Sequence, residues 1–356
     1  MVYKTVPGTM GMFEISGHSQ SEFADYLAKN SIDSYRAKQV FYWIYKKSKL
    51  DFSGFTNLPK PVVGFLKQNC SILSGEIITC VVSKSDSTKK FLIKLDDGNL
   101  IESVLLQSDD KRLTACVSTQ VGCAVSCVFC ASGKTAFKRN LTCSEIISQY
   151  LLMRQALPDG NDISNIVFMG IGEPLLNFDN LKNAINLFTD PDAGGIGARR
   201  ITVSTAGVAP AIEKLADYKK QVNLSVSLHS AFDKNRNLLV PLNKKYNIEA
   251  LLAAVKNYIS KTKRLVTFEY VLIKGVNDAE VDAVGLGRIL KNINCKVNLI
   301  PYNKIEGLDY KAPSSVEVES FRKILIKNRI NVVRRQRKGF DINSGCGQLK
   351  AGFLNK

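Results

Sequence analysis

The sequence lacks any long hydrophobic run, because no stretch reaches the roughly 18 apolar residues that a membrane-spanning helix needs. Its first residues also contain no apolar core of the kind found in secretory signals. These absences argue against a membrane or secreted protein, and we expect a cytoplasmic one. In a reducing compartment, the nine cysteines would serve metal or redox chemistry rather than a disulfide framework.

Acidic residues are scarce relative to basic ones. The 356 residues include 49 Lys and Arg but only 32 Asp and Glu, which gives a formal net charge of +17. Part of this excess lies in short basic groups, such as Lys46-Lys47, Arg199-Arg200 and Arg334-Arg335. A basic pair on a helix is usually only solvated surface, but a total excess of this size attracts phosphate backbones. We therefore expect a nucleic-acid partner.

Three of the cysteines lie close together, at Cys123, Cys127 and Cys130. Thiolates are the usual ligands of iron–sulfur clusters, and a cubane normally takes four. Three cysteines can hold three irons and leave the fourth open to a small molecule. The alternatives are a zinc site and a structural set of buried thiols. Structural zinc sites usually have a second tight cysteine pair, which this sequence lacks, so an iron–sulfur cluster is favoured.

The first 107 residues divide into two expected parts. In residues 1–76 a loosely ordered start of about 20 residues precedes three small helices, near 21–27, 35–47 and 62–69. This part is expected to be an RNA-binding accessory domain, with a packing cap as the plain alternative. Residues 77–107 predict a β-hairpin around the turn Asp96 to Asn99. Glu102 in its second strand is, taken alone, more typical of an outward-facing residue than of a catalytic base.

From residue 108 to 335 the pattern alternates between strand and helix. Repeated units of this length predict a parallel sheet with right-handed crossovers, and six units are too few for a closed eight-stranded barrel. The expected fold class is therefore α/β: a partial (β/α)6 TIM-like barrel with a small, mainly helical N-terminal accessory domain. Residues 336–356 form a C-terminal segment. Strands are expected near 112–118, 163–169, 200–204, 222–228, 266–273 and 297–301.

Polar residues follow several of these strands, at the edge of the sheet where ligands bind in such folds. Gly172 and Glu173 follow the second strand, and Ser204 ends the third. Each could belong to an ordinary turn with a helix cap, and a lone His229 would usually be structural. Together they place varied polar groups around the cysteine loop. The fourth and sixth strands add Ser227, Leu228, His229 and Asn303.

These motifs resemble a known family. The spacing Cys-x3-Cys-x2-Cys after the first strand, with Gly-Glu after the second, resembles the radical S-adenosylmethionine superfamily. The stretches 120–123, 168–175, 228–230 and 341–349 together resemble the dual-specificity adenine-C2 RNA methyltransferases called RlmN, over about residues 20–350. The resemblance implies the radical S-adenosylmethionine fold, one 4Fe–4S cluster and two S-adenosylmethionine molecules per turnover. It also implies methylation of C2 of adenosine 2503 in 23S rRNA and of adenosine 37 in tRNA.

The resemblance further implies roles for individual residues. Cys123, Cys127 and Cys130 match the cluster ligands. Cys346 matches the cysteine that is methylated and then transfers its carbon to C2, and Cys116 matches the one that releases the product by forming a disulfide with it. Glu102 matches the residue that accepts the C2 proton. The matches to S-adenosylmethionine contacts are Gly172, Glu173, Ser204, Ser227, Leu228, His229 and Asn303.

Two alternatives remain open. A sister family methylates C8 of the same rRNA adenosine and usually has Gly-Glu-Ala-Leu where this chain has Gly172-Glu173-Pro174-Leu175, so C2 is favoured. The other is a non-catalytic, zinc-containing RNA-binding protein. The chain also has Asn343-Ser344-Gly345 where the family often has Asp-Ala-Ala, and the glycine predicts a more mobile loop. Further expectations are an electron donor such as a flavodoxin-type reductase system, no membrane partner and a monomer.

Overall fold

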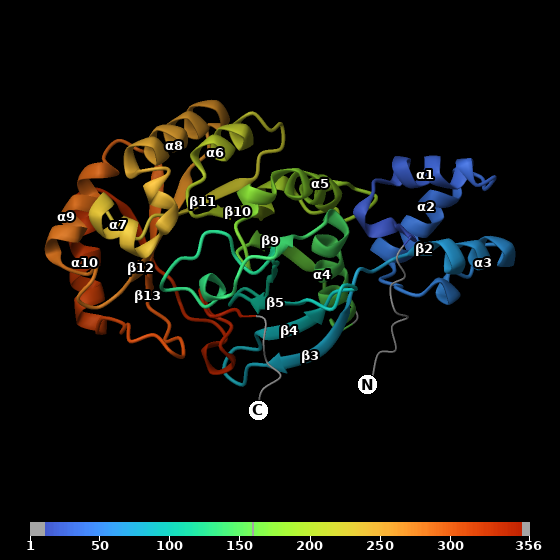
Figure 1. The fold of residues 1–356 in the computed structure, drawn as a ribbon, viewed down its shortest axis with the longest axis horizontal. Helices are drawn as coiled ribbons and strands as arrows, with labels where there is room; N and C mark the ends of the chain where they lie inside the picture. Colours follow the sequence, from blue (N-terminus) through green and yellow to red (C-terminus); the bar gives the residue numbers. More distant parts are fainter. Residues whose placement is uncertain (1–10, 159, 351–356) are drawn as a thin grey trace.

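The computed structural model describes residues 11–158 and 160–350, and a curved sheet of ten strands runs through the larger part of it (Figure 1). Its strand order is β14-β13-β12-β11-β10-β9-β6-β5-β4-β3. The strands from β6 to β14 are parallel, whereas β3, β4 and β5 are antiparallel. The strands are β3 (Glu76–Val82), β4 (Lys89–Lys94), β5 (Leu100–Gln107), β6 (Leu113–Cys116), β9 (Ile163–Phe168), β10 (Ile201–Thr205), β11 (Asn223–Ser227), β12 (Val266–Leu272), β13 (Cys295–Pro301) and β14 (Asn331–Arg334).

The helices that connect the parallel strands cover the outside of this sheet (Figure 1). Buried aliphatic and aromatic side chains fill the space between the two layers, with Phe268 and Tyr270 of β12 fully enclosed. None of the helices in the described ranges is long and apolar enough to cross a bilayer. The helices are α4 (Cys143–Gln155), α5 (Phe178–Thr189), α6 (Ala209–Ala216), α7 (Asp233–Leu239), α8 (Ile248–Thr262), α9 (Glu280–Ile289) and α10 (Ser315–Lys327).

The predicted partial barrel is confirmed, since all six expected strands are present and run parallel to one another. One further parallel strand, β14, extends the sheet beyond β13 and was not predicted. β14 is short and three of its four residues are exposed, so its residues lack the apolar pattern of a buried strand. It places the start of the C-terminal segment beside the ends of the other strands.

The three predicted N-terminal helices are present and form a unit at one side of the barrel (Figure 1). They are α1 (Gln20–Lys29), α2 (Arg36–Phe41), which continues as a π-helical turn over Tyr42–Lys46, and α3 (Lys60–Asn69). The expectation of a loosely ordered start is wrong for residues 11–20, and residues 1–10 lie outside the described ranges. β1 (Phe13–Glu14) pairs with β2 (Cys70–Ser71), and Ile15 is fully buried. That pairing spans over 50 residues, so local sequence does not reveal it.

The predicted hairpin is present as β4 and β5, and β3 pairs with its outer side. β5 also pairs with β6, with Val104 opposite Cys116, so the hairpin is continuous with the barrel sheet. The outward orientation considered for Glu102 is wrong, because its side chain is completely buried. The C-terminal segment, whose Lys350 backbone N–H donates to the Glu102 carboxylate, covers the face that an isolated hairpin would expose to solvent.

Candidate active site

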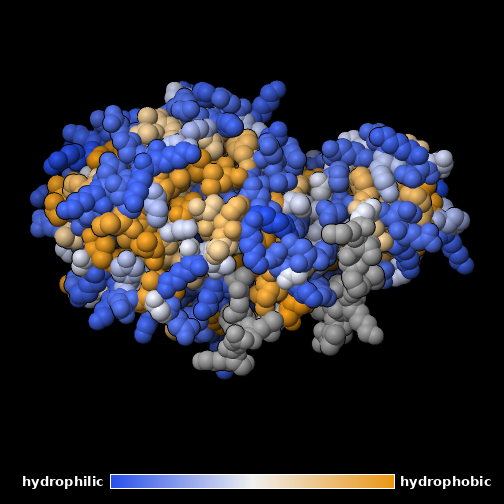
Figure 2. Space-filling model, viewed as in Figure 1, coloured by the Kyte–Doolittle hydropathy of each residue, from blue (hydrophilic) through white to orange (hydrophobic). Residues whose placement is uncertain are grey.

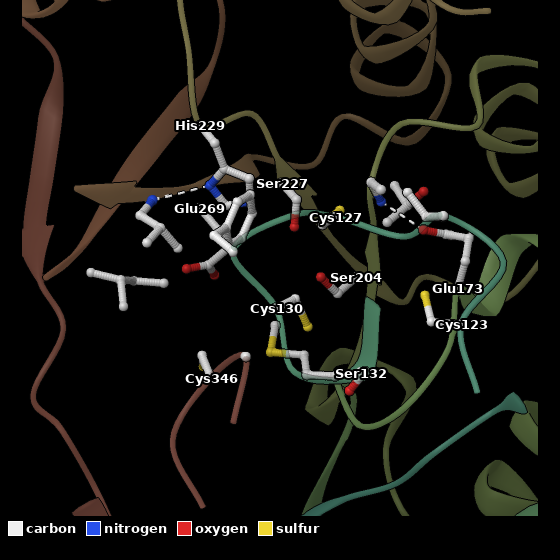
Figure 3. A pocket seen from close by; sticks show the side chains of 18 of the residues that line it. Cys123, Cys127, Cys130, Ser132, Glu173, Ser204, Ser227, His229, Glu269 and Cys346 are labelled. Atoms are coloured by element: carbon white, nitrogen blue, oxygen red, sulfur yellow. Dashed lines mark hydrogen bonds between the residues drawn. The ribbon is translucent and has the colours of Figure 1, made fainter. Parts of the chain in front are cut away.

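A cavity of about 160 Å³ lies at the carboxyl ends of the parallel strands, beside the three-cysteine loop (Figure 3). In Figure 3, Glu173 and Cys123 lie at one end, His229 and Glu269 at the other, and Cys346 faces the cavity from the C-terminal segment. The structure therefore brings together residues more than 200 positions apart in the sequence. Predicted site residues that line this cavity are Cys123, Cys127, Cys130, Gly172, Glu173, Ser204, Ser227, His229, Asn303 and Cys346.

The cysteine loop is held in a compact turn. The backbone N–H of Cys130 donates to the carbonyl of Cys127 at 3.2 Å, and Phe129 packs into an apolar cluster under the loop. Gly133 lies so close that a Cβ atom there would be 2.4 Å from the Cys127 carbonyl oxygen. Only a glycine at this position permits that approach.

Three thiols on one wall of a single cavity fit a 4Fe–4S cluster, whose irons are each held by a separate cysteine. Burial raises the pKa of Cys123 to about 11 and also raises that of Cys127 well above its ordinary value. Such thiols become ligands only when a metal displaces their protons. Within residues 11–158 and 160–350, no group of three His, Cys, Asp or Glu side chains converges in a way that would chelate a single metal ion.

Glu173 presents a buried carboxylate to the cavity. Its Oε2 accepts a hydrogen bond from the backbone N–H of Ala206 at 2.7 Å, and its Oε1 accepts one from Leu175 at 3.0 Å. Burial raises the pKa of Glu173 to about 7, although these hydrogen bonds oppose the shift. The carboxylate is thus fixed in orientation and can take up or lose a proton near neutral pH.

The loop before Glu173 is pressed against Gln120. The Gln120 side chain accepts a hydrogen bond from the backbone N–H of Glu173 at 2.9 Å and donates one to Asn140 at 2.8 Å. Gly172 has φ of +104°, and a Cβ atom there would lie 2.5 Å from the Cβ of Gln120. Gln120 therefore positions Glu173, a role that its sequence context alone does not reveal.

His229 is buried at the opposite end of the cavity. Its Nδ1 accepts a hydrogen bond from the backbone N–H of Val271 at 3.0 Å, so the ring proton is on Nε2. Burial lowers the pKa of His229 to about 3, and the nearby Arg236 contributes to the shift. His229 is therefore a neutral imidazole at physiological pH. It offers hydrogen bonding and an aromatic face to a ligand rather than a charge.

Leu228 and Arg236 support this part of the site from behind. The side chain of Leu228 lies in the barrel core and is not among the residues that line the cavity. Its carbonyl accepts from Nε of Arg236 at 2.9 Å, and the same guanidinium donates to the carbonyls of Ala206 and Ser227 at 2.6 and 3.0 Å. Arg236 thus ties together the ends of β10 and β11. The sequence gives little sign that this arginine is buried.

The segment that carries Cys346 is held directly against the cysteine loop. The backbone N–H of Ala131 donates to the carbonyl of Gly347, and the Ser132 hydroxyl donates to the carbonyl of Leu349, both at 2.7 Å. The Asn303 amide donates to the carbonyl of Cys346 at 3.1 Å. A Cβ atom on Gly345 would lie 2.8 Å from that amide nitrogen. In this chain the glycine therefore also makes room for Asn303, besides the mobility expected of it.

Cys116 and Glu102 lie on the other side of the same segment. A smaller cavity of about 70 Å³ is lined by both Cys116 and Cys346, which are free thiols. Glu102 is not among the lining residues of either cavity. Its Oε2 accepts a hydrogen bond from the backbone N–H of Lys350 at 2.8 Å, and its Oε1 lies 3.5 Å from the ammonium of Lys90. The base predicted from the sequence is thus buried beneath the C-terminal segment.

Arg335, which lies between the two cavities, and Glu269, which lines the larger one, were not identified as site residues from the sequence. Arg335 lines both cavities, and its Nη1 lies 3.7 Å from Oε2 of Glu269. The neighbouring Cys346 and Glu269 raise the pKa of this arginine. In the sequence Arg335 belongs to a basic group that is typical of a solvated surface, and only the end of β14 brings it to the cysteines.

Comparisons with known proteins agree with this geometry. The family model described as the radical SAM superfamily matches residues 117–285. A second model, described as the ribosomal RNA large subunit methyltransferase N-terminal domain, matches residues 13–72. The two matches together span the helical unit and most of the barrel.

Curated relatives match nearly the whole chain. A probable dual-specificity RNA methyltransferase RlmN from Clostridium novyi is 42% identical over 343 residues, which is 96% of this chain and 99% of the relative. A dual-specificity RNA methyltransferase RlmN from Desulfosudis oleivorans is 43% identical over 95% of this chain and 91% of the relative. A crystal structure of a radical SAM methyltransferase from Sphaerobacter thermophilus superimposes with a TM-score of 0.93 at 40% identity, over 96% of this chain and 100% of that one.

Proposed function

Because the chain belongs to the RlmN family of radical S-adenosylmethionine RNA methyltransferases, we propose that it methylates C2 of adenosine 2503 in 23S rRNA and of adenosine 37 in tRNA. Family membership implies a 4Fe–4S cluster and S-adenosylmethionine as cofactors, and RNA as the substrate. The observation that carries the proposal is the position of Cys346. It lines the cavity of the three-cysteine loop and also the smaller cavity that contains Cys116.

Different residues of the cavity would hold the two cofactors. Cys123, Cys127 and Cys130 would bind three irons, and Glu173 with the backbone at Gly172 would bind the amino group of S-adenosylmethionine. The remaining contacts to the cofactor would come from Ser204, Ser227, the Leu228 backbone, His229 and Asn303. A cluster bound there would supply the electron for reductive cleavage of S-adenosylmethionine.

Cys346 then acts as the carrier of the methyl carbon. Its sulfur would first lose its proton and accept a methyl group from one S-adenosylmethionine molecule, which leaves as S-adenosylhomocysteine. The methyl group would later give a hydrogen atom to the 5′ carbon of a second S-adenosylmethionine molecule, which ends as methionine and 5′-deoxyadenosine, and the methyl carbon would then bond to C2 of the adenine. Glu102 accepts the proton that C2 must lose. The hydrogen bonds from Ala131 and Ser132 to the Cys346 segment would keep a methyl group on Cys346 at the cavity, which favours reaction by proximity.

Cys116 is proposed to release the product. Its sulfur would lose its proton and attack the sulfur of Cys346, and a Cys116–Cys346 disulfide would form as the bond from that sulfur to the transferred carbon breaks. The carbon would keep the electron pair of the broken bond and take up a proton, which completes the methyl group. A thiol reductant must then restore both cysteines. An electron donor such as a flavodoxin-type reductase system would supply the cluster, and we propose a monomer that acts in the cytoplasm.

We further propose that RNA docks on the N-terminal helical unit. Tyr35 and Tyr42 are 56% and 44% exposed, and they are seven residues apart, about two turns of helix. Arg36 lies over the ring of Tyr35 at 4.5 Å, and Lys47 lies over the ring of Tyr42 at 5.5 Å. Exposed rings next to cations are the usual platform for unpaired bases. Figure 2 shows that hydrophilic side chains cover much of this unit.

Nucleoside mass spectrometry of rRNA and tRNA, analysed separately, tests the proposal in cells that lack or express the protein. We expect 2-methyladenosine in both RNAs only when the protein is expressed. Finding 8-methyladenosine instead would support the sister activity and sink the C2 assignment. The alternative of a non-catalytic zinc protein has lost its support, because the chain belongs to a family of enzymes.

The Cys116→Ala variant tests the release step. Without the second thiol the link between Cys346 and RNA cannot be broken, so we expect a covalent protein–RNA species on denaturing gels. Cys70→Ala, at a buried cysteine outside both cavities, is the control and should turn over normally. Normal turnover of Cys116→Ala without a crosslink would remove Cys116 from the mechanism.

A further inference from the structure

Lys90 is a buried lysine that the proposed mechanism does not use. It lies on β4 opposite Val104 of β5, and Val104 in turn lies opposite Cys116 of β6. The side chains of Lys90 and Glu102 are only 3% and 1% exposed, and the Lys90 ammonium lies 3.5 Å from Oε1 of Glu102. A lysine is rarely buried to this extent unless it is paired with an acceptor. We therefore asked what function the Lys90–Glu102 ion pair could have.

The same ammonium contacts the segment that carries the methyl carrier. Lys90 Nζ donates a hydrogen bond to the carbonyl of Asn343 at 3.3 Å, three residues before Cys346. Asn343 is in the left-handed region, with φ of +50°, which directs the chain into the Cys346 turn. A single side chain thus contacts both Glu102 and the Cys346 segment.

We infer that Lys90 is a positioning residue that keeps Glu102 ionised as a base and orients it only while the Cys346 segment is docked. This inference rests on the proposed function, in which Glu102 accepts the C2 proton. Lys90 does not touch the RNA base in this scheme. It acts through Glu102.

Electrostatics support this role. Burial raises the pKa of Glu102, and the charge of Lys90 is the largest opposing influence, ahead of the backbone N–H and the ammonium of Lys350. Burial lowers the pKa of Lys90, and Glu102 opposes that shift, while Lys350 adds to it. Among the described residues, Oε1 of Glu102 makes no hydrogen bond, so the 3.5 Å ion pair is the contact that favours a negative charge there. Removing one partner of a buried ion pair leaves the other charge uncompensated.

The proton transfer balances without a further reactant. The C2–H bond breaks, its electron pair stays with the carbon skeleton, and an O–H bond forms on Glu102, which becomes neutral. Lys90 keeps its charge and its contact with the Asn343 carbonyl. Without the Lys90 charge, burial would favour the neutral form of Glu102 more strongly, and the carboxylate would be less available to accept this proton.

The pH dependence of RNA methylation tests the inference with Lys90→Met, Lys90→Gln and Lys90→Arg. Met removes the charge and the hydrogen bond, Gln removes only the charge, and Arg retains both. For Met and Gln we expect the acidic limb of the rate profile to move up by about one pH unit, because the pKa of Glu102 rises further. On the acidic limb itself the rate should therefore fall about tenfold, and it should recover at the alkaline end of the profile. The Arg variant should follow the wild-type profile.

Lys89→Met is the matched control. Lys89 is the neighbouring residue of the same strand, so its side chain points to the other face, where it donates to the carbonyl of Ala156 at 3.3 Å. The Lys89→Met variant should leave the pH–rate profile of RNA methylation unchanged. Mass analysis of Cys346 methylation is the second readout, and it should be normal in every variant because that step does not use Glu102.

Several outcomes would overturn the inference. A uniform loss of rate at every pH in the Met and Gln variants would show a merely structural role. Loss of Cys346 methylation in both would place Lys90 in the first half-reaction instead. If the Lys90→Met variant does not fold, the pH–rate profile of Lys90→Gln alone decides between a positioning role and a structural role. Failure of wild-type protein to methylate Cys346 would overturn the proposed function instead, so the two failures are distinguishable.

Discussion

Cys116 and Cys346, the proposed disulfide partners, differ sharply in their surroundings. Cys346 is exposed, whereas Cys116 is buried, and burial raises the pKa of the Cys116 thiol to about 12. At pH 8 such a thiol is ionised to roughly one part in ten thousand. Because the thiolate is the nucleophile, Cys116 is unreactive until the C-terminal segment moves or a substrate changes its surroundings.

Alkylation mapped by mass spectrometry checks this difference. Iodoacetamide at pH 8 should modify Cys346 and the exposed Cys80 quickly, and Cys116 more slowly by a factor of at least about one hundred. Cys70, also buried with a pKa raised to about 12, is the matched control and should react as slowly as Cys116. Equal rates at Cys116 and Cys346 would mean that the segment opens freely in solution.

The sequence allowed polar residues that line the cavity to be identified, but it did not show which lysine and arginine side chains are buried. The cysteines, Glu173, His229 and Asn303 could be identified because they follow strands or form a recognisable motif. Arg335 and Lys90 could not, because each stands in a basic stretch that is typical of a solvated surface. Whether a lysine or arginine is buried depends on long-range pairing, which the local sequence does not contain.

At the scale of elements, the loop after β9 depends on a glycine. Gly172→Ala would force φ of +104° on a residue with a Cβ atom and place that atom 2.5 Å from Gln120. We expect a loss of about 2 kcal/mol in the free energy of unfolding, with weaker binding of S-adenosylmethionine because Glu173 is displaced. Denaturant unfolding and equilibrium binding measure the two effects.

Gly197→Ala is the control for this substitution. Gly197 has φ of −60° and no heavy atom within 4 Å of the added Cβ position. It should change the free energy of unfolding by less than about 0.5 kcal/mol. A similar loss in both variants would show that the Gly172 backbone is not specially constrained.

Helices and strands could be predicted where a pattern in the local sequence indicates them. The six strands and their helices follow from alternation in the chain, and the β4–β5 hairpin follows from its Gly-containing turn. β14 and the β1–β2 pair were missed, because short strands depend on partners that are distant in sequence. The same limit applies to the C-terminal segment, whose contacts with Ala131 and Ser132 reach back more than 200 residues.

At the scale of the whole molecule, the net charge of +17 and the Tyr35–Tyr42 face make separate predictions. Tyr35→Ala and Tyr42→Ala should each weaken binding of an RNA stem-loop by about tenfold, because a stacked base loses its platform. Binding should also weaken steeply as salt rises, from the release of counterions. Filter binding at several salt concentrations measures both.

Tyr246→Ala is the control, since Tyr246 also has a lysine over its ring, Lys245 at 5.4 Å, but lies in the barrel. It should leave RNA affinity unchanged. If all three variants bind RNA equally well, the helical unit does not contact RNA through this face, and the barrel's own basic groups must bind it.

The row of Lys90, Val104 and Cys116 across three adjacent strands restricts where this chain can change in length. One residue inserted within Leu100–Gln107 would turn every later side chain of β5 to the opposite face and separate either Glu102 from Lys90 or Val104 from Cys116. Insertions in the turn at 96–99 or in the loop at 108–112 would leave the row intact. Length variation among descendants of this sequence should therefore concentrate in those two connections, while the strand between them keeps a fixed number of residues.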